Sequence, residues 1–503
     1  MIKILTAKEM KEVDNYSINE LKIPALALME SAARSVALEI KKDRCISDKI
    51  VAVCGIGNNG ADGVAVIRLL KSMGYENTDI IIIGDISKGT EEFKIQTDIA
   101  GRLDISISNY TEDIQDVNLS AYDVIVDGLF GIGLSREVTG VYYEVIKNIN
   151  NSTAKKYAVD IPSGIDGNNG NILGIAVKAD YTITFGSYKA GLVLYPGAEY
   201  AGEVKIYDIG FPDKAYENRK IIYSYTEEDL YESLPVRKPH SNKGSYGKLV
   251  IIAGNEDMYG ACYMCSRASF ALGTGLIKIL TTKENKYLLN EKLPEAIVVT
   301  YDDDNYSEII KKELTWCDTI LVGPGIGATK RSENIVKLCL KEKKNTIIDA
   351  DGINVISGSD TLKEMLHDKV VLTPHLGEMS RLINMSISDI SKDMIKVCKK
   401  WADALGVSIV MKDSHTIICN TRDEIFINLT GNSGMAKAGS GDVLAGIMAG
   451  LVSTGVEINK AAAVAPFIHG ISGNIAKRKQ GEYAMLPTDI ISAMEYLNKC
   501  IIH

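Results

Sequence analysis

Short runs of apolar residues alternate with longer segments of helical periodicity along the whole chain. Buried parallel strands read as continuous apolar runs, whereas the helices between them read as amphipathic segments. The alternation therefore predicts repeated β–α units arranged in parallel sheets. In the first half we expect helices at 10–20 and 25–42, then strands at 49–55, 79–85, 122–130, 156–164, 181–187 and 203–210. In the second half we expect strands at 248–254, 276–282, 296–301, 319–325, 345–351, 369–375 and 407–413.

The chain is too long for a single hydrophobic core. It has 503 residues, whereas one domain usually takes about 100 to 200. Residues 211–226 are rich in charge and read as a linker between two halves. We therefore expect two α/β domains of three layers each, the first at residues 1–216 and the second at residues 225–503.

Composition and charge exclude several classes of protein. Hydrophobic residues make up 46% of the chain and charged residues 24%, which is typical of a globular protein. The net charge of −9 argues against nucleic acid or an anionic membrane as the main partner. No apolar run reaches the roughly 18 residues that a membrane-spanning helix needs. Charged residues from Lys8 onward leave no room for a secretory signal, and the nine cysteines lie in apolar segments, which indicates reduced thiols and a cytoplasmic location.

Cys262 and Cys265 form a C-x-x-C motif. Neither a second cysteine pair nor a nearby histidine accompanies them, and their surroundings read as a helix rich in small residues. Packing of that helix is the favoured interpretation, with metal binding or redox chemistry as the alternative.

A glycine-rich turn in the second half leads into an apolar helical pattern. Residues 431–451 read GNSGMAKAGSGDVLAGIMAGL, so that small residues run directly into Asp442. Backbone N–H groups of such a turn converge on one point and form a phosphate site. We expect Asp442, in the first helical turn, to be ionised and to act as a base that activates a hydroxyl for phosphoryl transfer. A helix merely capped by Gly-Ser-Gly-Asp is the alternative.

A second glycine-rich turn follows the strand at 49–55. It reads GIGNNGADG from Gly55 to Gly63 and contains the G-x-G-x-x-G pattern of dinucleotide-binding turns. Asn58, Asn59 and Asp62 make the motif more specific, because a plain dinucleotide turn needs no polar side chains. The amides can orient a ligand or a hard cation. A tight strand-to-helix turn without a ligand is the alternative.

Two further strands of the first half end in aspartate. Asp127 closes YDVIVD, and Asp160 closes KYAVD. Ligands of open parallel sheets bind outside the carboxyl ends of the strands. We therefore expect Asn59, Asp127 and Asp160 to converge on one crevice. Structural capping of a loop is the alternative for either aspartate alone.

Taken together, these motifs resemble a known family. GNNGADG, VDGLFGIGLSRE and VDIPSGIDG resemble the NAD(P)H-hydrate epimerase domain, which implies a Rossmann-like parallel sheet. HSNKGSYGKLVIIAG, GPGIG, TPHLGE and GNSGMAKAGSGDVLAGIMAG resemble the nucleotide-dependent NAD(P)H-hydrate dehydratase, which implies a ribokinase-like α/β domain. Their order resembles that of the bifunctional NAD(P)H-hydrate repair enzymes of bacteria. The resemblance covers roughly residues 9–214 and 225–500.

In the first domain the resemblance implies a role for each matching residue. The hydrated nicotinamide would contact Asn58, Asn59, Gly60, Ala61, Asp62, Gly131, Ile132, Gly133, Leu134, Ser135, Arg136, Glu137 and Asp160. Asp160 would be the acid–base residue. A potassium ion would be held by Asn59, Asp127 and Ser163, since a hard cation takes oxygen ligands. Lys189 is a second acid–base candidate, although a surface lysine is the favoured interpretation.

In the second domain the resemblance implies a hydrate site and a nucleotide site. The hydrate would contact Ala261, Gly325, His375 and Asp442, with Asp442 as the catalytic base. The nucleotide, accompanied by magnesium, would contact Lys412, Asp413, Ser414, His415, Thr416 and Gly441. Taken alone, His375 reads as a hydrogen-bonded structural histidine. Asp413 and Lys437 depart from the family pattern, and we expect the charge of Lys437 to offset part of the repulsion between Asp413 and phosphate.

The implied chemistry links the two domains. Water added to the reduced nicotinamide ring gives NADHX or NADPHX, with a hydroxyl on carbon 6 beside the ring nitrogen. The first domain would interconvert the R and S forms. The second would dehydrate the S form with ADP, which yields AMP and phosphate, or with ATP. The resemblance also implies a homo-oligomer without a nucleic-acid or membrane partner.

Three alternatives remain open. A ribokinase-like small-molecule kinase, fused to a Rossmann-like binding domain, would share the glycine-rich turn and Asp442 but would release a stable phosphorylated product. A nicotinamide dehydrogenase would share GIGNNG and place Asp85 on the ribose. The first domain could also bind its ligand without catalysis, in which case substitution of Asp160 would leave its behaviour unchanged.

Overall fold

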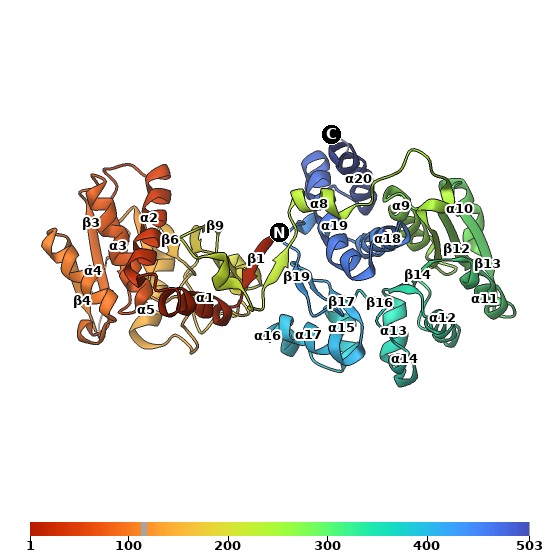
Figure 1. The fold of residues 1–503 in the computed structure, drawn as a ribbon, viewed down its shortest axis with the longest axis horizontal. Helices are drawn as coiled ribbons and strands as arrows, with labels where there is room; N and C mark the ends of the chain where they lie inside the picture. The colour runs from red at the N-terminus through yellow and green to blue at the C-terminus, as the bar shows by residue number, and fades with distance from the viewer. Residues whose placement is uncertain (112–117, 502–503) are drawn as a thin grey trace. The chain divides into compact units, whose positions relative to one another are not determined.

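A computed structural model describes residues 1–111 and 118–501. The chain divides into two compact units, which are drawn in Figure 1. The N-terminal unit comprises residues 3–221, and the C-terminal unit comprises residues 222–503 together with residues 1–2.

Within the described residues, the N-terminal unit contains a seven-stranded sheet in the order β4-β3-β2-β5-β6-β7-β9. All of its neighbouring strands pair in parallel, as the apolar runs predict. The strands are β2 (Ile50–Cys54), β3 (Thr78–Ile83), β4 (Ser106–Tyr110), β5 (Val124–Gly128), β6 (Lys155–Val159), β7 (Tyr181–Phe185) and β9 (Glu203–Tyr207). A further parallel pairing joins β1 (Ile2–Leu5) to β8 (Tyr188–Lys189).

Helices cover both faces of this sheet and complete a three-layer unit. Side chains of α2, α3 and α4 pack on one face, and α5 packs on the other. The helices are α1 (Ala7–Asn19), α2 (Ala25–Asp43), α3 (Asn58–Ser72), α4 (Glu91–Arg102), α5 (Gly140–Asn151), α6 (Ala190–Val193) and α7 (Gly197–Tyr200). Short 3-10 turns lie at Ile86–Lys88, Leu119–Ala121 and Asp213–Tyr216. The three-layer Rossmann-like prediction is confirmed for this unit.

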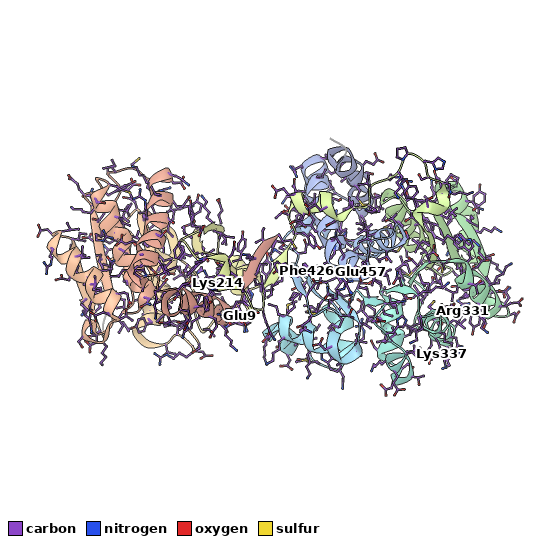
Figure 2. All side chains as sticks on the ribbon, in the orientation of Figure 1. Glu9, Lys214, Arg331, Lys337, Phe426 and Glu457 are labelled. Atoms are coloured by element: carbon purple, nitrogen blue, oxygen red, sulfur yellow. The ribbon has the colours of Figure 1, made fainter. Side chains whose placement is uncertain are left out.

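The C-terminal unit contains a longer sheet, ordered β13-β12-β11-β14-β15-β16-β17-β18-β19-β10. Most neighbours are parallel, but β18 runs antiparallel to both β17 and β19. The strands are β10 (Ile222–Ser224), β11 (Lys248–Ile252), β12 (Leu276–Thr282), β13 (Ile297–Tyr301), β14 (Thr319–Val322), β15 (Asn345–Ile348), β16 (Val370–Leu372), β17 (Ser408–Met411), β18 (Ile417–Cys419) and β19 (Ile425–Ile427). The second half of the predicted linker at 211–226 is thus part of the sheet, because β10 pairs with β19 and Tyr223 lies beside Phe426, which is labelled in Figure 2.

The helices of the C-terminal unit also form two layers around its sheet. They are α8 (Glu227–Ser233), α9 (Tyr259–Ala271), α10 (Lys286–Lys292), α11 (Tyr306–Trp316), α12 (Lys330–Lys341), α13 (Asp351–Ser357), α14 (Asp360–Glu364), α15 (Leu376–Ile383), α16 (Ile387–Lys392), α17 (Met394–Leu405), α18 (Ser440–Ser453), α19 (Ile458–Gln480) and α20 (Pro487–Ile501). Short 3-10 turns lie at Lys243–Tyr246, Lys283–Asn285 and Ser433–Met435. The surface helix α12 carries Arg331 and Lys337, which are labelled in Figure 2, and buries its opposite apolar face.

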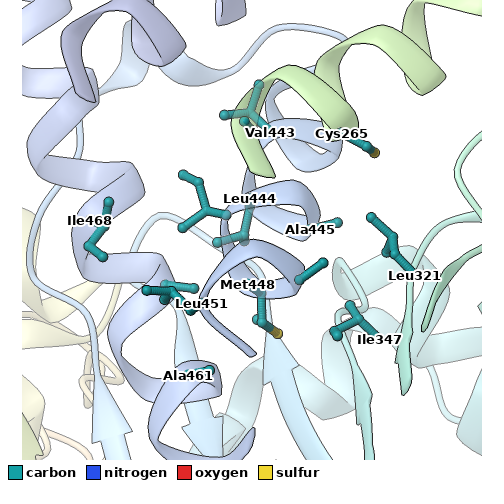
Figure 3. Packing of buried hydrophobic residues seen from close by; sticks show 14 of the residues in the cluster. Cys265, Leu321, Ile347, Val443, Leu444, Ala445, Met448, Leu451, Ala461 and Ile468 are labelled. Atoms are coloured by element: carbon teal, nitrogen blue, oxygen red, sulfur yellow. The ribbon is translucent and has the colours of Figure 1, made fainter. Parts of the chain in front are cut away.

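The helix α18 is the centre of the C-terminal core. Nearly all of its residues are buried, as expected for a helix that is apolar on every side and lies between a sheet and other helices. Figure 3 shows its side chains against strand residues Leu321 and Ile347 and against Ile468 of α19. Close packing against α9 requires glycine at position 446, because a Cβ there would lie 2.3 Å from the carbonyl oxygen of Cys265 and 2.9 Å from the Cβ of Ala268.

We expect Gly446→Ala to lower the free energy of unfolding of the C-terminal unit by about 1–3 kcal/mol, because α9 and α18 must separate to admit the methyl group. Gly260→Ala on α9 is the matched control, since its Cβ would meet only the Cε of Met264, at 3.7 Å. Guanidinium unfolding followed by tryptophan fluorescence measures this unit alone, because both tryptophans, Trp316 and Trp401, lie in it. Equal unfolding midpoints for the two variants would contradict the packing argument.

Candidate active sites

A cavity of about 780 Å³ opens at the carboxyl ends of the strands in the N-terminal unit. Turns after β2, β5 and β6 form its walls, as expected for an open parallel sheet. Most of the residues predicted to bind the hydrate line it: Asn58, Asn59, Asp62, Gly131, Ile132, Gly133, Leu134, Ser135, Arg136 and Asp160. Gly60 and Ala61 are buried behind this wall, and Glu137 is exposed outside it.

The turn between β2 and α3 depends on the glycine at position 60. A Cβ on Gly60 would lie 1.8 Å from the carbonyl oxygen of Gly55, so that only glycine lets the turn close. The closed turn presents Asn58 and Asn59 at the start of α3, beside the cavity. Asp85, the ribose-binding candidate of the dehydrogenase alternative, accepts hydrogen bonds from Ser87 and is not among the residues that line the cavity.

Asp160 and Lys189 form a buried ion pair at the cavity wall. The Lys189 side chain is 1% exposed, so the favoured interpretation of a surface lysine is wrong. The error arises because a single lysine between apolar residues gives no sign that its ammonium has a buried partner. Asp160 adopts φ +67°, which is a strained backbone conformation for a residue with a side chain. Its Oδ1 accepts hydrogen bonds from Lys189 Nζ, Thr184 Oγ1 and the backbone N–H of Phe185, and the residue lines the cavity.

Further acidic side chains face the same cavity. Asp14 on α1 and Glu92 on α4 line it, and neither is predictable from the sequence, because both lie in helical segments of ordinary polarity. Burial, reinforced by the charge of Asp160, raises the pKa of Asp14. Burial also raises the pKa of Asp62 well above its ordinary value, with Asp160 and Asp14 adding to the effect. Both carboxyls therefore keep their protons to a higher pH than an exposed aspartate does.

Beneath the cavity, Asp127, Ser163, Asn59 and Phe130 bring several oxygen atoms together. Ser163 donates to Asp127 through Oγ at 2.6 Å and through its backbone N–H at 2.8 Å. The carbonyl oxygen of Phe130 accepts from Asn59 Nδ2 at 3.0 Å and from Ser163 Oγ at 3.2 Å. Burial raises the pKa of Asp127 to about 6, although the hydrogen bonds from Ser163 oppose the shift. No basic side chain among the described residues forms an ion pair with Asp127, which is the situation that a bound cation would relieve.

In the C-terminal unit, the predicted hydrate and nucleotide residues meet at the carboxyl edge of the sheet. A Cβ on Gly325 would lie 3.3 Å from the Cβ of Ala261, so the turn after β14 touches the start of α9. His375 begins α15, where its Nδ1 accepts from the N–H of Gly377 at 2.9 Å and Glu378 accepts from the N–H of His375 at 2.9 Å. The histidine thus has the structural role of a helix cap, and its ring remains about half exposed.

Lys412 lies at the centre of this edge. Its Nζ is 2.7 Å from Asp349 and 3.9 Å from Glu378, both of which are buried. A Cβ on Gly441 would lie 3.4 Å from the same Nζ, so the ammonium is directly beneath the glycine-rich turn. Burial lowers the pKa of Lys412, but Asp349 and Glu378 outweigh it, and the net shift is upward. The sequence analysis assigns no role to Asp349 or Glu378, although Asp349 falls within the strand expected at 345–351 and Glu378 ends the quoted motif TPHLGE.

Asp442 lies in the first turn of α18, as predicted, but its pKa is not the low one that a carboxylate favoured by a helix N-terminus would have. Burial and then the charge of Asp349 raise its pKa to about 7, against the lowering effect of Lys412. Burial and the charge of Asp349 thus oppose the favourable effect of the helix N-terminus on the ionised carboxylate. The neighbouring His469 lies 3.3 Å from Ser440 Oγ through Nε2, and burial together with Lys412 lowers its pKa to about 4. His469 is therefore neutral at physiological pH.

The remaining predicted nucleotide residues follow β17. Asp413 and Ser414 are exposed, His415 is half-buried, and Thr416 is buried. Lys437 does not face them, because its Nζ donates to the carbonyl oxygens of Tyr483 at 2.7 Å and Met485 at 2.6 Å. The expectation that Lys437 offsets the charge of Asp413 is therefore wrong. A lysine that is close to a phosphate-binding turn in the sequence can instead donate its hydrogen bonds to the carbonyl oxygens of another loop, as Lys437 does.

The C-x-x-C cysteines have a packing role. Cys262 and Cys265 are free and buried on α9, and burial raises the pKa of Cys262 to about 12. Among the described residues, no group of three or more His, Cys, Asp and Glu side chains is arranged to hold a metal ion. No helix in the described part of the chain has the length and apolarity needed to cross a membrane.

Comparison with known proteins matches both units to one family. Residues 25–191 match the family model described as YjeF-related protein N-terminus, and residues 249–495 match NAD(P)H-hydrate dehydratase. The chain is 33% identical to the bifunctional NAD(P)H-hydrate repair enzyme Nnr of Thermofilum pendens, over 99% of this chain and 96% of that protein. It is 31% identical to the enzyme of the same name from Escherichia coli, over 88% and 84% of the two chains. A solved ribokinase-like superfamily protein from Enterococcus faecalis is 31% identical, covers 55% of this chain and 96% of its own, and has a TM-score of 0.50. The chain therefore belongs to the family of bifunctional NAD(P)H-hydrate repair enzymes.

Proposed function

We propose that the protein repairs hydrated nicotinamide cofactors at two separate sites. The N-terminal site interconverts the R and S forms of NADHX and NADPHX, and the C-terminal site dehydrates the S form with ADP or ATP. The observation that carries the proposal is a pair of carboxyl-edge sites, one in each family-matched unit, each with an aspartate placed for proton exchange: Asp160 and Asp442. The small-molecule kinase alternative accounts for only one of the two units.

At the N-terminal site, Asp160 exchanges a proton with the hydroxyl on carbon 6. Protonation lets that hydroxyl leave as water while the lone pair of the ring nitrogen forms the iminium, and water then returns to the opposite face of the ring and gives its proton back. Lys189 donates to Oδ1 of Asp160, which lines the cavity. The apolar wall, including Phe130 and Ile132, supports the ring and limits access of bulk water.

A potassium ion fits the oxygen cluster of this unit. Asp127 would supply the negative charge, and Ser163, Asn59 and the carbonyl of Phe130 would supply neutral oxygen donors. A bound cation would neutralise the buried carboxylate and fix the turns that carry Asn59 and Phe130. Those turns line the cavity, so a cation that fixes them would also fix the side chains that contact the ligand.

At the C-terminal site, Asp442 accepts the proton of the carbon-6 hydroxyl as that oxygen attacks the terminal phosphoryl group of ADP. The bond to AMP breaks, and the phosphorylated hydrate then loses phosphate from carbon 6 and a proton from carbon 5 to restore the reduced cofactor. The N–H groups of the glycine-rich turn and the ammonium of Lys412 stabilise the negative charge that develops on phosphate. Ala261, Gly325 and His375 line the hydrate side of the same edge.

Magnesium would enter with the nucleotide rather than occupy a dedicated cage. Mg²⁺ is commonly bound by phosphates and one or two carboxylates while it keeps several waters. This matches an edge where carboxylates are present but already share a lysine. Homo-oligomeric assembly and a cytoplasmic location are parts of the same proposal that rest on the family resemblance.

We expect Asp442→Asn to reduce dehydration of S-NADHX by about 100- to 10,000-fold, because the base is lost, and to leave epimerisation unchanged. We expect Asp160→Asn to reduce epimerisation and to leave dehydration of S-NADHX unchanged. Each variant is the matched control for the other, since both replace a buried aspartate by its isosteric amide. Chromatography of the two epimers measures epimerisation, and absorbance of the reduced nicotinamide measures dehydration. Loss of both activities in either variant would contradict the assignment of separate sites.

We expect potassium to stabilise the N-terminal unit more strongly as the pH rises from about 4 to 6. The pKa of Asp127 is raised to about 6 in the folded chain, so without a cation the folded state binds the proton more tightly and stability falls as the proton leaves. A cation removes that loss by favouring the carboxylate. Hydrogen exchange of peptides from residues 122–164 measures the effect, with choline chloride at equal ionic strength as the salt control. Asp127→Asn should abolish the difference between the salts, and persistence of the difference would exclude this cation site.

A further inference from the structure

Asp349 is a buried carboxylate at the end of β15 to which neither the motifs nor the family resemblance assigns a role. Its side chain is 2% exposed and receives two charged or polar donors. Thr373 Oγ1, at the end of the neighbouring strand β16, donates to Oδ1 at 2.7 Å, and Lys412 Nζ, after β17, donates to the same atom at 2.7 Å. Asp349 therefore ties three adjacent strand ends together on the edge where nucleotide and hydrate meet.

The backbone of Lys412 is held as firmly as its ammonium. Its N–H donates to the carbonyl oxygen of Pro374 at 2.7 Å, and the residue forms a parallel bridge with His375. Because the backbone of Lys412 is fixed, the position of its ammonium depends only on the side-chain conformation. Asp349 is the nearest acidic partner of that ammonium. Glu378, at 3.9 Å, is already engaged by the N–H of His375.

The Asp349–Lys412 pair lies against the glycine-rich turn. A Cβ on Gly441 would be 3.4 Å from Lys412 Nζ and 3.8 Å from Asp349 Oδ2, with no other contact within 4 Å. A phosphoryl group bound to the N–H groups of this turn would come within reach of the ammonium. It would also meet the negative charge of Asp349, unless Lys412 remains between the two.

We propose that Asp349 is a positioning residue of the dehydratase, which holds Lys412 beneath the glycine-rich turn so that its ammonium is shared between Asp349 and the terminal phosphoryl group during transfer. The inference rests on the proposed function of this site. In the nucleotide-free protein, Asp349 neutralises the lysine. When the nucleotide binds, the carboxylate of Asp349 keeps the ammonium of Lys412 beside the terminal phosphoryl group. The ammonium then stays in place while the phosphoryl group is transferred.

The same carboxylate affects the catalytic base. Asp442 is faced by Asp349 from the sheet, by Lys412 from the strand end and by Cys262 and Cys265 from α9. The two thiols are neutral, because burial raises the pKa of each. His469 from α19 and Glu378 from α15 act on Lys412 rather than directly on Asp442. Burial and Asp349 are thus the two causes that raise the pKa of Asp442, and only Asp349 can be removed without exposing the site.

The test is Asp349→Asn, which keeps the shape and the acceptor for Thr373 but removes the charge. With S-NADHX and ADP, we expect kcat to fall about 10- to 100-fold, because Lys412 loses its fixed place. The acid limb of the pH–rate profile should move about one unit lower, since a like charge beside Asp442 is gone. The Kd for ADP, measured by calorimetry, should stay unchanged or become several-fold tighter, because a carboxylate no longer competes with phosphate for the ammonium.

Asp368→Asn is the matched control, because Asp368 is an exposed aspartate that precedes β16 at the opposite end of the sheet. It should change none of the three quantities. If Asp349→Asn does not fold, as judged by tryptophan fluorescence, Thr373→Val gives a second test, since it removes the hydroxyl that orients Asp349 and keeps both charges. That variant should lower kcat without weakening ADP binding and without moving the acid limb.

A merely structural role for Asp349 predicts parallel losses of stability, ADP affinity and kcat with an unmoved acid limb, and this outcome would overturn the proposal. Wild-type kcat and pH profile in Asp349→Asn would overturn it as well. Failure of the proposed function is distinguishable, because wild-type protein would then not dehydrate S-NADHX at all. The ADP titration would still test the pair in that case: weaker binding in Asp349→Asn would contradict a competition between carboxylate and phosphate for Lys412.

Discussion

Parallel strands all end at one edge of their sheet, and within each unit this constraint brings polar residues from different strands together. In the N-terminal unit the turns after β2, β5 and β6 deliver Asn59, Asp127 and Asp160 to one place. In the C-terminal unit the ends of β15, β16 and β17 deliver Asp349, Thr373 and Lys412. Helices cover both faces of each sheet with their apolar sides, so the strand ends are where charged side chains can meet solvent and ligand. The chemistry follows from that geometry.

Each unit stabilises a buried carboxylate at this edge with a lysine, but the two ion pairs have different consequences. Desolvation of a charge is unfavourable, and a partner charge with further hydrogen bonds offsets it. Lys189 binds one oxygen of Asp160, which itself lines the cavity, so the paired aspartate is the residue that we propose to exchange protons. Lys412 binds Asp349 below the glycine-rich turn, so the unpaired Asp442 is the acid that titrates near neutral pH. In the C-terminal unit, therefore, the paired aspartate positions the lysine and a different aspartate transfers the proton, whereas in the N-terminal unit the paired aspartate transfers the proton itself.

Much of this arrangement was predictable from the sequence. Apolar runs located the central strands of both sheets, strand-end motifs located Asp127 and Asp160, and the glycine-rich turn located Asp442. The edge strand β4 escaped detection, because most of its residues are exposed and it lacks an apolar run. The short strands β18 and β19 and their antiparallel pairing were also missed, since three residues give no usable period. Burial of Lys189 and the raised pKa of Asp442 depend on partners distant in the sequence, which local patterns do not encode.

The most direct test of the account is the absorbance of the reduced nicotinamide after wild-type protein is added to a mixture of R- and S-NADHX with ADP, magnesium and potassium. Two cooperating sites predict recovery of the NADH absorbance from both epimers, with no recovery above the spontaneous rate when nucleotide is omitted. AMP and phosphate should appear in step with NADH. Recovery that stops at the S fraction would contradict an epimerase in the N-terminal unit. Accumulation of a stable phosphorylated product without NADH would contradict the dehydratase and favour a small-molecule kinase.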